Sequence, residues 1–366
     1  MNSRFLILAE GAFSPLRSKT ANACIRYTPD NVVAVIDSTR AGQTAQDVLG
    51  FGGSIPVVAT LADGLSRRPN ALLIGIAPPG GQLPPAWRSL ILEAIDHRLE
   101  VWSGLHTLLG DDAEFARRAR EKGVTIHDLR RPPNDLDVAR GRVRELDDKV
   151  TVILTVGTDC NIGKMTTQLQ LRDAMRARGM RVAFAATGQT GILVEGWGIS
   201  VDAVIADFIA GAAERLTLQA AKEADIVLVE GQGSIIHPSY SGVTYGLLHG
   251  SLPHAMVMCA QPSRTAINNH PWVKIPPLAE FIEMQEAAAA PLRPAPVIAI
   301  ALNTYDLSER DARAAIERVV AETELPATDP VRFDPAPIVD AIDEFHRRRF
   351  ALAGQVDRFS TSKAEG

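Results

Sequence analysis

The sequence predicts an α/β protein in which an N-terminal Rossmann-like domain precedes a P-loop NTPase-like domain built on a parallel sheet. Apolar, β-branched runs alternate with amphipathic helical patterns along most of the chain, which is typical of parallel sheets covered by helices. One of these runs leads directly into a glycine-bounded loop that ends in Gly-Lys. The length of 366 residues is sufficient for two domains with separate hydrophobic cores.

Six short apolar runs predict the strands of the first domain, and two amphipathic stretches predict helices between them. The strands are expected at residues 4–9, 32–37, 56–59, 71–76, 100–102 and 125–128, and the helices at residues 85–98 and 112–122. The first run is interrupted at Glu10, so it is predicted to be a strand and not a signal peptide. We place this domain at residues 1–148, ending in a polar, proline-containing linker.

The second domain is placed at residues 149–350, and residues 351–366 are predicted to form a tail whose last six residues are disordered. After the strand that leads into the Gly-Lys loop, further strands are expected at residues 181–186, 225–230, 255–259 and 297–303. Helices are expected at residues 168–178 and 308–322. This order of strands and helices predicts a second parallel sheet.

The Gly-Lys loop is the strongest functional signal of the chain. In a P-loop, backbone N–H groups and the N-terminus of the following helix point at one spot, and the lysine adds a positive charge there. Such a loop binds a phosphate or a pyrophosphate. The candidate cofactor-binding residues are Gly157, Thr158, Asp159, Asn161, Ile162, Gly163, Lys164, Met165, Thr166 and Thr167.

The loop departs from the common P-loop in two ways. Five residues, instead of four, separate Gly157 from Gly163, and Met165 stands where a serine or threonine normally holds Mg²⁺. Two alternatives follow. Either Thr166 takes over the metal-binding role, or the loop binds phosphate without metal-assisted chemistry.

Three side chains near the predicted P-loop are candidates for catalysis. Glu230 ends a buried strand, and the carboxyl ends of parallel strands meet at the edge where ligands bind. It is predicted to act as a Mg²⁺ ligand or as an acid/base group. His237 follows in the next loop and has an ordinary pKa that suits proton transfer near neutrality. Asp207 is predicted to complete a metal or amine site.

Polar side chains of the loops at the same edge are predicted to contact the substrate. Arg264 is included because a guanidinium group binds a carboxylate through two parallel hydrogen bonds. The candidate substrate-binding residues are Gln189, Thr190, Gln232, Ser234, Tyr240 and Arg264. No group of cysteine and histidine residues has the spacing of a zinc site, so no dedicated metal site is predicted.

The composition excludes several classes of protein. The net charge of −5 argues against a nucleic-acid partner and against a polybasic membrane-binding surface. No run of eighteen apolar residues predicts a membrane span. The three cysteine residues are dispersed and odd in number, which is typical of a reducing cytoplasm. The expected partner is therefore a small-molecule substrate.

Two segments of the second domain resemble the P-loop family that includes dethiobiotin synthetase. These are the loop from Gly157 to Lys164 and the strand end Val229-Glu230-Gly231-Gln232-Gly233. That family has threonine directly after the lysine and a substrate-binding lysine at the end of the following strand. This chain has Met165 at the first position and Ala185-Ala186-Thr187-Gly188 at the second, so it departs from the family where carboxylation chemistry needs these residues.

A more extensive resemblance covers residues from about 4 to 348. Segments 157–167, 186–192, 229–238 and 241–250, together with the Rossmann-like first half, resemble a bacterial family of domains of unknown function. Its characterised branch is the DgcN-type D-glutamate N-acetyltransferase family. The resemblance implies transfer of an acetyl group from acetyl-CoA to the amine of D-glutamate, in D-amino acid catabolism.

This resemblance also implies roles for the site and for partners. Coenzyme A carries a pyrophosphate and a 3′-phosphate, which a P-loop can bind without hydrolysing anything, so acetyl-CoA is the expected cosubstrate. The missing hydroxyl for Mg²⁺ then costs little, and Mg²⁺ stays a second, less favoured candidate. Either His237 or Glu230 would then be the base, and backbone N–H groups of residues 231–234 would stabilise the oxyanion. A racemase is the implied metabolic partner, and a homo-oligomer is expected for a cytoplasmic enzyme of this class.

Other functions remain open at the level of sequence. An ATP-dependent ligase or kinase of the dethiobiotin synthetase type is favoured by Glu230 and opposed by Met165. A nucleotide-sensing module without catalysis would not need the polar loop at residues 237–244. An NAD-dependent epimerase is opposed by the first strand, which no Gly-x-Gly-x-x-Gly sequence follows.

Overall fold

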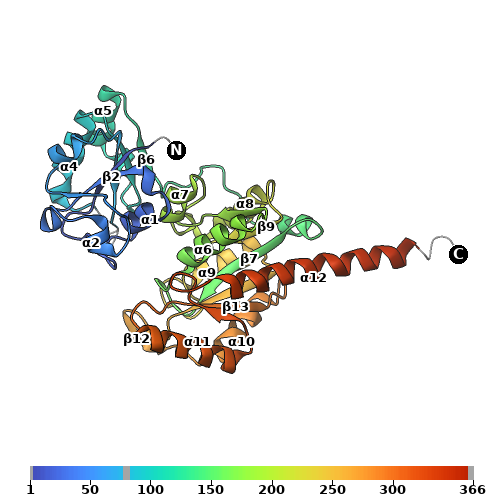
Figure 1. The fold of residues 1–366 in the computed structure, drawn as a ribbon. Coiled ribbons are helices and arrows are strands. Elements are labelled where there is room, and N and C mark those ends of the chain that lie inside the picture. The colour runs from blue at the N-terminus through green and yellow to red at the C-terminus, as the bar shows by residue number, and fades with distance from the viewer. Residues whose placement is uncertain (1–2, 77–82, 362–366) are drawn as a thin grey trace. The chain divides into compact units, whose positions relative to one another are not determined.

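The computed structural model describes residues 3–76 and 83–361, with side chains up to residue 351 (Figure 1). The chain forms two compact units, one of residues 1–133 and 188–203 and the other of residues 134–187 and 204–366. The predicted domain limits at residues 148 and 350 stay predictions. None of the helices in the described part of the chain is both long and apolar enough to cross a membrane.

The first unit contains a six-stranded sheet. Its strands are β1 (Phe5–Leu8), β2 (Val32–Ile36), β3 (Val57–Val58), β4 (Ala71–Ile74), β5 (Glu100–Ser103) and β6 (Ile126–Asp128). Their order is β3-β2-β1-β4-β5-β6, and every neighbouring pair is parallel. This is the strand order of a doubly wound Rossmann sheet, so the predicted fold of the first half is confirmed.

Five helices connect these strands. They are α1 (Lys19–Tyr27), α2 (Ala45–Leu49), α3 (Leu61–Leu65), α4 (Arg88–Asp96) and α5 (Ala113–Lys122). Both ends of α5 show how the sequence sets helix boundaries. Asp112 accepts hydrogen bonds from the first-turn N–H groups of Glu114 and Phe115, and Gly123 ends the helix in the left-handed conformation.

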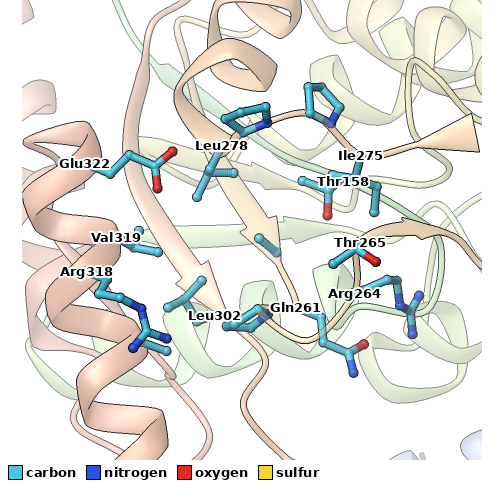
Figure 2. Close-up of a pocket in the computed structure, with 15 residues that line it drawn as sticks. Thr158, Gln261, Arg264, Thr265, Ile275, Leu278, Leu302, Arg318, Val319 and Glu322 are labelled. Atoms are coloured by element: carbon cyan, nitrogen blue, oxygen red, sulfur yellow. The ribbon is translucent and has the colours of Figure 1, made fainter.

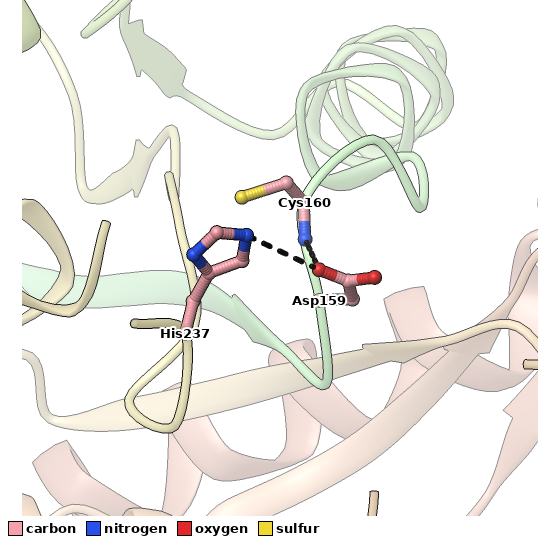
Figure 3. A group of neighbouring side chains, drawn as sticks. All are labelled: Asp159, Cys160 and His237. Carbon is pink, nitrogen blue, oxygen red and sulfur yellow. Dashed lines mark hydrogen bonds and ion pairs between the residues drawn. The ribbon is translucent and has the colours of Figure 1, made fainter. Parts of the chain in front are cut away.

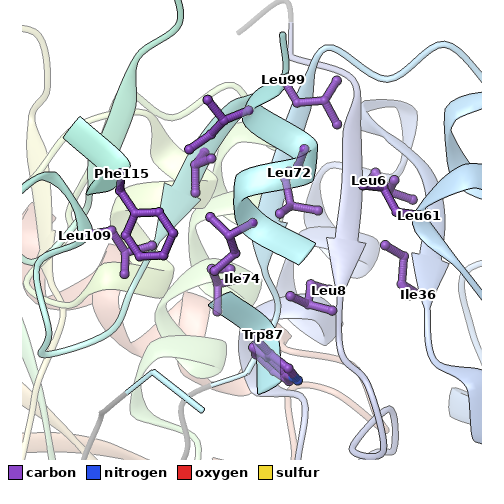
Figure 4. Packing of buried hydrophobic residues seen from close by; sticks show 14 of the residues in the cluster. Leu6, Leu8, Ile36, Leu61, Leu72, Ile74, Trp87, Leu99, Leu109 and Phe115 are labelled. Carbon is purple, nitrogen blue, oxygen red and sulfur yellow. The ribbon is translucent and has the colours of Figure 1, made fainter. Parts of the chain in front are cut away.

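Both faces of the first sheet are buried under these helices. Along β1, Leu6 and Leu8 belong to one hydrophobic cluster, whereas Phe5 and Ile7 belong to another. Neighbouring side chains of a strand point to opposite faces, so the two clusters lie on the two sides of the sheet. Figure 4 shows the first cluster, which includes Phe115 of α5. Burial on both faces explains why the strands read as continuous apolar runs.

A segment from the middle of the sequence completes the first unit. Helix α7 (Gln189–Glu195) places Leu193 in the second cluster, where it is only 2% exposed. The hydroxyl groups of Thr190 in α7 and Thr20 in α1 lie 3.5 Å apart. Packing against α1 therefore ties α7 to the first unit.

The second unit contains another six-stranded parallel sheet. Its strands are β7 (Thr151–Gly157), β8 (Val182–Ala185), β9 (Ile226–Val229), β10 (Ala255–Ala260), β13 (Val297–Leu302) and β14 (Ala327–Thr328). Their order is β14-β13-β10-β7-β9-β8, and all five pairs are parallel. The predicted parallel sheet of the second half is thereby confirmed. A two-stranded antiparallel hairpin, β11 (Ala266–Ile267) with β12 (His270–Lys274), was not predicted.

The helices of this unit include the one that follows the P-loop. They are α6 (Lys164–Ala177), α8 (Ala206–Ala220), α9 (Ser241–Ser251), α10 (Leu278–Ala289), α11 (Glu309–Thr323) and α12 (Ala336–Thr361). Helix α12 extends into the segment predicted as a tail, whereas residues 362–366 lie outside the described residues.

The buried side chain of His254 lies beside Asp147 and Arg293 at the start of the second sheet. The Nδ1 atom of His254 accepts a hydrogen bond from the N–H of Val152 at 2.9 Å, and its Nε2 atom lies 3.2 Å from Asp147 Oδ1 and 2.9 Å from Arg293 Nη1. Burial, followed by the charges of Arg349 and Arg293, lowers the pKa of His254 well below its ordinary value of 6.5. The imidazole is therefore neutral in the folded protein at neutral pH.

This neutral histidine makes stability depend on pH. Below pH 6.5, His254 becomes protonated in the unfolded chain but not in the folded protein. The free energy of unfolding therefore decreases as the pH is lowered, by up to ~1.4 kcal/mol per pH unit. Asparagine offers an acceptor near the place of Nδ1 and does not titrate. We expect His254→Asn to reduce the loss of stability between pH 7 and pH 5 by about 2 kcal/mol, measured by urea unfolding. Equal losses in the two proteins would contradict this expectation.

Candidate functional site

The P-loop forms as the sequence predicts, between the end of β7 and the start of α6. Gly163 caps the helix with a φ of 106°, and Asn161 also has a positive φ, 52°. Only glycine adopts the first of these conformations without strain, and asparagine tolerates the second better than most residues. The helix N-terminus therefore points its N–H groups into the loop, where an anion can bind.

Lys164 adds a positive charge at this place. Its side chain is almost buried, and Nζ donates a hydrogen bond to the carbonyl oxygen of Asp159 at 2.6 Å. This hydrogen bond within the P-loop fixes the position of the lysine side chain. An ammonium group in this position, next to a helix N-terminus, attracts a phosphate.

Asp159 fastens the loop to its surroundings. Its carboxylate is completely buried. Oδ1 accepts a hydrogen bond from the N–H of Cys160 at 2.6 Å, and Oδ2 accepts one from the N–H of Asn268 at 2.8 Å and one from Arg264 at 3.0 Å. Arg264 also donates to the carbonyl oxygen of Cys160. Both residues therefore shape the loop, whatever ligand it binds.

The remaining predicted residues of the loop differ in exposure. Asn161 is exposed, whereas Ile162 and Met165 are buried. Thr167 is also buried, and its hydroxyl group lies 3.7 Å from Cys259 Sγ in β10. Thr166 is partly exposed, so of the two threonines it is the one that remains accessible.

Glu230 lies where β9 ends, as predicted, and it is 5% exposed. Its carboxylate accepts a hydrogen bond from the N–H of Thr187, which follows β8, and the Thr187 hydroxyl donates to the Glu230 carbonyl. The next N–H, of Gly231, donates to Thr155 in β7. Glu230 is therefore fixed at the carboxyl edge of the sheet, between β9 and β8.

The loop after Glu230 is fastened to the P-loop. The hydroxyl of Ser234 is fully buried and donates to the carbonyl of Thr158. The side chain of Gln232 donates to the Thr187 carbonyl at 2.6 Å. Tyr240 is 53% exposed, and its ring contacts that of His237 in a tilted arrangement with ring centroids 4.6 Å apart. Ser234 thus links this loop to the P-loop, while Tyr240 remains accessible.

His237 is brought to the P-loop by this arrangement (Figure 3). Its Nε2 atom lies 3.9 Å from Asp159 Oδ1, and its Nδ1 atom accepts a hydrogen bond from the N–H of Ser239 at 3.1 Å. Burial lowers the pKa of His237; the Asp159 carboxylate opposes this effect, and His270 and Lys164 reinforce it. A neutral imidazole whose Nδ1 accepts a hydrogen bond carries its proton on Nε2. His237 therefore presents a hydrogen-bond donor to the P-loop.

Cys160, which the sequence analysis did not select, lies at the same place. One ligand atom each from Asp159, Cys160 and His237 fall within 4.8 Å of one another. A histidine that binds a metal normally donates its other ring N–H. Here Nδ1 of His237 accepts an N–H, and both Asp159 oxygens already accept hydrogen bonds. These hydrogen bonds describe a group that holds the shape of the P-loop better than they describe a metal centre.

Three other predicted residues belong to helices outside the P-loop and the loop after Glu230. Gln189 and Thr190 belong to α7 of the first unit, where Gln189 Cγ lies 2.6 Å from the position of a Cβ atom at Gly104. Asp207 belongs to the second unit but is exposed in the first turn of α8, where an acidic side chain stabilises the helix N-terminus.

A cavity of about 430 Å³ adjoins the P-loop within the second unit (Figure 2). Thr158 and Arg264 line it on the side of the loop, and Arg318, Val319 and Glu322 of α11 line it on the other. Its volume lies within the range of ligand-binding pockets, roughly 300 to 1,000 Å³. The sequence analysis did not predict the cavity, because its walls come from segments far apart in the chain.

Comparison with known families agrees with the two units. A domain of unknown function described as the DUF1611_C P-loop domain matches residues 137–339. A second one, described as the DUF1611_N Rossmann-like domain, matches residues 38–132.

Individual relatives are similar over most of the chain. A D-glutamate N-acetyltransferase from Tritonibacter scottomollicae is 36% identical over 92% of this chain and 98% of its own. A protein of the same name from a Pseudoalteromonas species is 39% identical over 72% of this chain and 78% of its own. The crystal structure of a DUF1611 family protein from Anabaena variabilis is 40% identical and superposes with a TM-score of 0.89, covering 94% of this chain and all of that one.

Proposed function

Because this chain belongs to the DUF1611 family, with its Rossmann-like and P-loop domains, we propose that it transfers an acetyl group from acetyl-CoA to the amine of D-glutamate. The observation that carries the proposal is similarity to proteins named D-glutamate N-acetyltransferase along nearly the whole chain, the P-loop included. The proposal includes a cytoplasmic homo-oligomer and a racemase that acts on its product.

The P-loop supports a cosubstrate with phosphate groups. Acetyl transfer breaks a thioester and leaves the phosphates of coenzyme A intact, so the loop needs only to hold them. This requirement accounts for Met165 at the place of the metal-binding hydroxyl. An ATP-dependent ligase would lose catalytic power from the same substitution and is not favoured.

The dimensions of coenzyme A separate the two candidate bases. Its pantetheine arm contains two amides and about a dozen backbone bonds, so the extended arm places the thioester more than ~10 Å from the pyrophosphate. His237 lies at the P-loop and offers a donor, which suits a phosphate oxygen. Glu230 lies at the end of β9, one strand from β7 at roughly 5 Å per strand, and its carboxylate accepts the N–H of Thr187 on the far side, after β8. We therefore assign His237 to the phosphates and Glu230 to the reacting amine.

The proposed reaction uses Glu230 as the base. The carboxylate takes a proton from the ammonium group of D-glutamate, and the amine nitrogen then attacks the thioester carbonyl carbon. The carbon–sulfur bond breaks, and the leaving thiolate of coenzyme A takes up the second proton that the attacking nitrogen loses as the amide forms. Backbone N–H groups of Gln232 and Gly233 are proposed to stabilise the oxyanion. Asp207 is proposed to attract the substrate ammonium.

The test is release of the coenzyme A thiol from acetyl-CoA, with D-glutamate and L-glutamate offered as separate acceptors and ATP turnover followed in parallel. We expect thiol release with D-glutamate and no loss of ATP. ATP hydrolysis stimulated by an amino acid, without thiol release, would overturn the proposal in favour of a ligase.

The P-loop lysine gives a second prediction. We expect Lys164→Met to weaken coenzyme A binding by about 10- to 100-fold, since charge-assisted hydrogen bonds contribute about 1.5 to 3 kcal/mol. Methionine retains the apolar stem of the buried side chain. The measurement is the Kd of coenzyme A by calorimetry, with the exposed Lys149→Met as a control. A variant that binds coenzyme A normally but has a raised KM for D-glutamate would place the amino acid in the loop instead.

A further inference from the structure

We infer that the cavity beside the P-loop holds the adenosine 3′-phosphate end of the acyl-CoA, and that Arg318 binds the 3′-phosphate. The inference rests on the proposed function, since it concerns the cosubstrate of that reaction. It adds a binding pocket and a specificity residue that the sequence analysis did not contain.

The cavity continues directly from the phosphate site. Thr158, the second residue of the P-loop, lines it. Arg264 lines it as well and donates hydrogen bonds to Asp159 and to the carbonyl of Cys160 in the loop. A molecule whose pyrophosphate lies in the P-loop therefore has its next chemical group at the mouth of this cavity.

The walls of the cavity suit a nucleoside. Ile275, Pro276, Pro277 and Leu278 form one side, and Leu302 at the end of β13 lies on another (Figure 2). Apolar walls with a few polar groups are typical of sites for flat, largely apolar ring systems. A volume of about 430 Å³ is sufficient for an adenosine group.

Helix α11 supplies the charged end. Ala315, Arg318, Val319 and Glu322 line the cavity at positions i, i+3, i+4 and i+7, which form one face of the helix. In Figure 2, Arg318 and Arg264 lie on opposite sides of the cavity. A ligand that spans them carries negative charge at both ends.

Acyl-CoA has this charge pattern and ATP does not. The pyrophosphate of coenzyme A would lie at the P-loop, and its separate 3′-phosphate would reach Arg318, whose planar guanidinium group binds phosphate through paired hydrogen bonds. Glu322 repels a phosphate, but its carboxylate can accept hydrogen bonds from the adenine amino group. These two side chains orient the nucleoside and select the 3′-phosphorylated form.

The test compares the Kd values of coenzyme A and 3′-dephospho-coenzyme A for the full-length protein by calorimetry at one fixed salt concentration. We expect the wild type to prefer coenzyme A by roughly tenfold or more. Arg318→Ala should abolish this preference, because it should raise the Kd of coenzyme A and leave the Kd of 3′-dephospho-coenzyme A unchanged. The control is Arg310→Ala on the same helix; that side chain is 91% exposed, and the preference should be retained. An Arg318→Ala protein that keeps the preference would overturn the inference.

A second variant tests the cavity itself. Val319→Trp fills the space between the apolar walls and should weaken both ligands about equally, with unchanged thermal unfolding showing that the fold is retained. Unchanged affinity for both ligands would overturn the adenosine assignment. If the wild type binds neither form of coenzyme A, the proposed function itself fails. If it binds and turns over acetyl-CoA without any preference for the 3′-phosphate, only the inference about Arg318 fails.

Discussion

Replacing Glu230 with glutamine is expected to lower kcat for acetyl transfer by about 10²- to 10⁴-fold, the usual contribution of a general base. Glutamine has nearly the same shape and can still accept the hydrogen bond from the N–H of Thr187. The fold and the position of the loop should therefore be retained, while the group that accepts the amine proton is lost. Steady-state kinetics with acetyl-CoA and D-glutamate measure the effect.

Two further measurements separate a base from a structural role. The Kd of coenzyme A should be unchanged in Glu230→Gln, because the phosphates lie at the P-loop. Thermal unfolding of the variant should also match that of the wild type, because glutamine keeps the hydrogen bond from the N–H of Thr187. Glu283→Gln in α10 exchanges an exposed glutamate in the same way and should leave kcat unchanged. A variant that loses coenzyme A affinity and keeps its kcat would contradict the assignment of Glu230.

The strands of both sheets could be predicted from the sequence because they are buried on both faces. The run predicted at residues 4–9 is β1 (Phe5–Leu8), and the run predicted at residues 225–230 is β9 (Ile226–Val229) followed by Glu230. The hairpin of β11 and β12 was missed for the opposite reason. Its strands are short and partly exposed, and Trp272 is 73% exposed, so no apolar pattern marks them.

The sequence predicted where the candidate site lies, but not which contacts each of its side chains makes. A sequence motif places Asp159 in the P-loop, but only the structure gives it hydrogen bonds to Asn268 and Arg264, more than a hundred residues away. Ser234 is a further example, because its hydroxyl donates a hydrogen bond to a carbonyl oxygen of the P-loop. Such assignments depend on contacts between distant segments, which periodicity and spacing do not contain.

The same limit applies to His237. Its ordinary pKa makes it the natural choice for a base, and the sequence offers no reason to prefer another role. The N–H of Ser239, two residues later, occupies Nδ1 and so fixes the proton on the nitrogen that faces the P-loop. A backbone hydrogen bond of this kind decides between a base and a donor, and it becomes visible only once the loop is folded.

A second large effect is expected at the packing of α8 against α9, the helix that begins directly after the His237 loop. Gly246 and Gly250 of α9 face α8. A Cβ atom at Gly250 would lie 2.0 Å from the carbonyl oxygen of Ala210 and 2.7 Å from its carbon. At Gly246 the nearest atom belongs to a side chain, Ile209 Cγ2, at 2.3 Å. A backbone carbonyl inside a helix cannot move without moving the helix.

We therefore expect Gly250→Ala to destabilise the second unit by about 3 kcal/mol, at the upper end of the cost of overpacking. The matched control is Gly242→Ala in the same helix, where a Cβ atom has no neighbour within 4 Å. That change should stabilise α9 by about 0.5 to 1 kcal/mol, because alanine favours helices over glycine. Thermal and urea unfolding measure both variants. Equal stability of the two alanine variants would contradict this prediction, because it would show that the close approach of α8 and α9 leaves room for a side chain at Gly250. If only Gly250→Ala also lost acetyl transfer, the packing of α9 would be what holds the His237 loop against the P-loop.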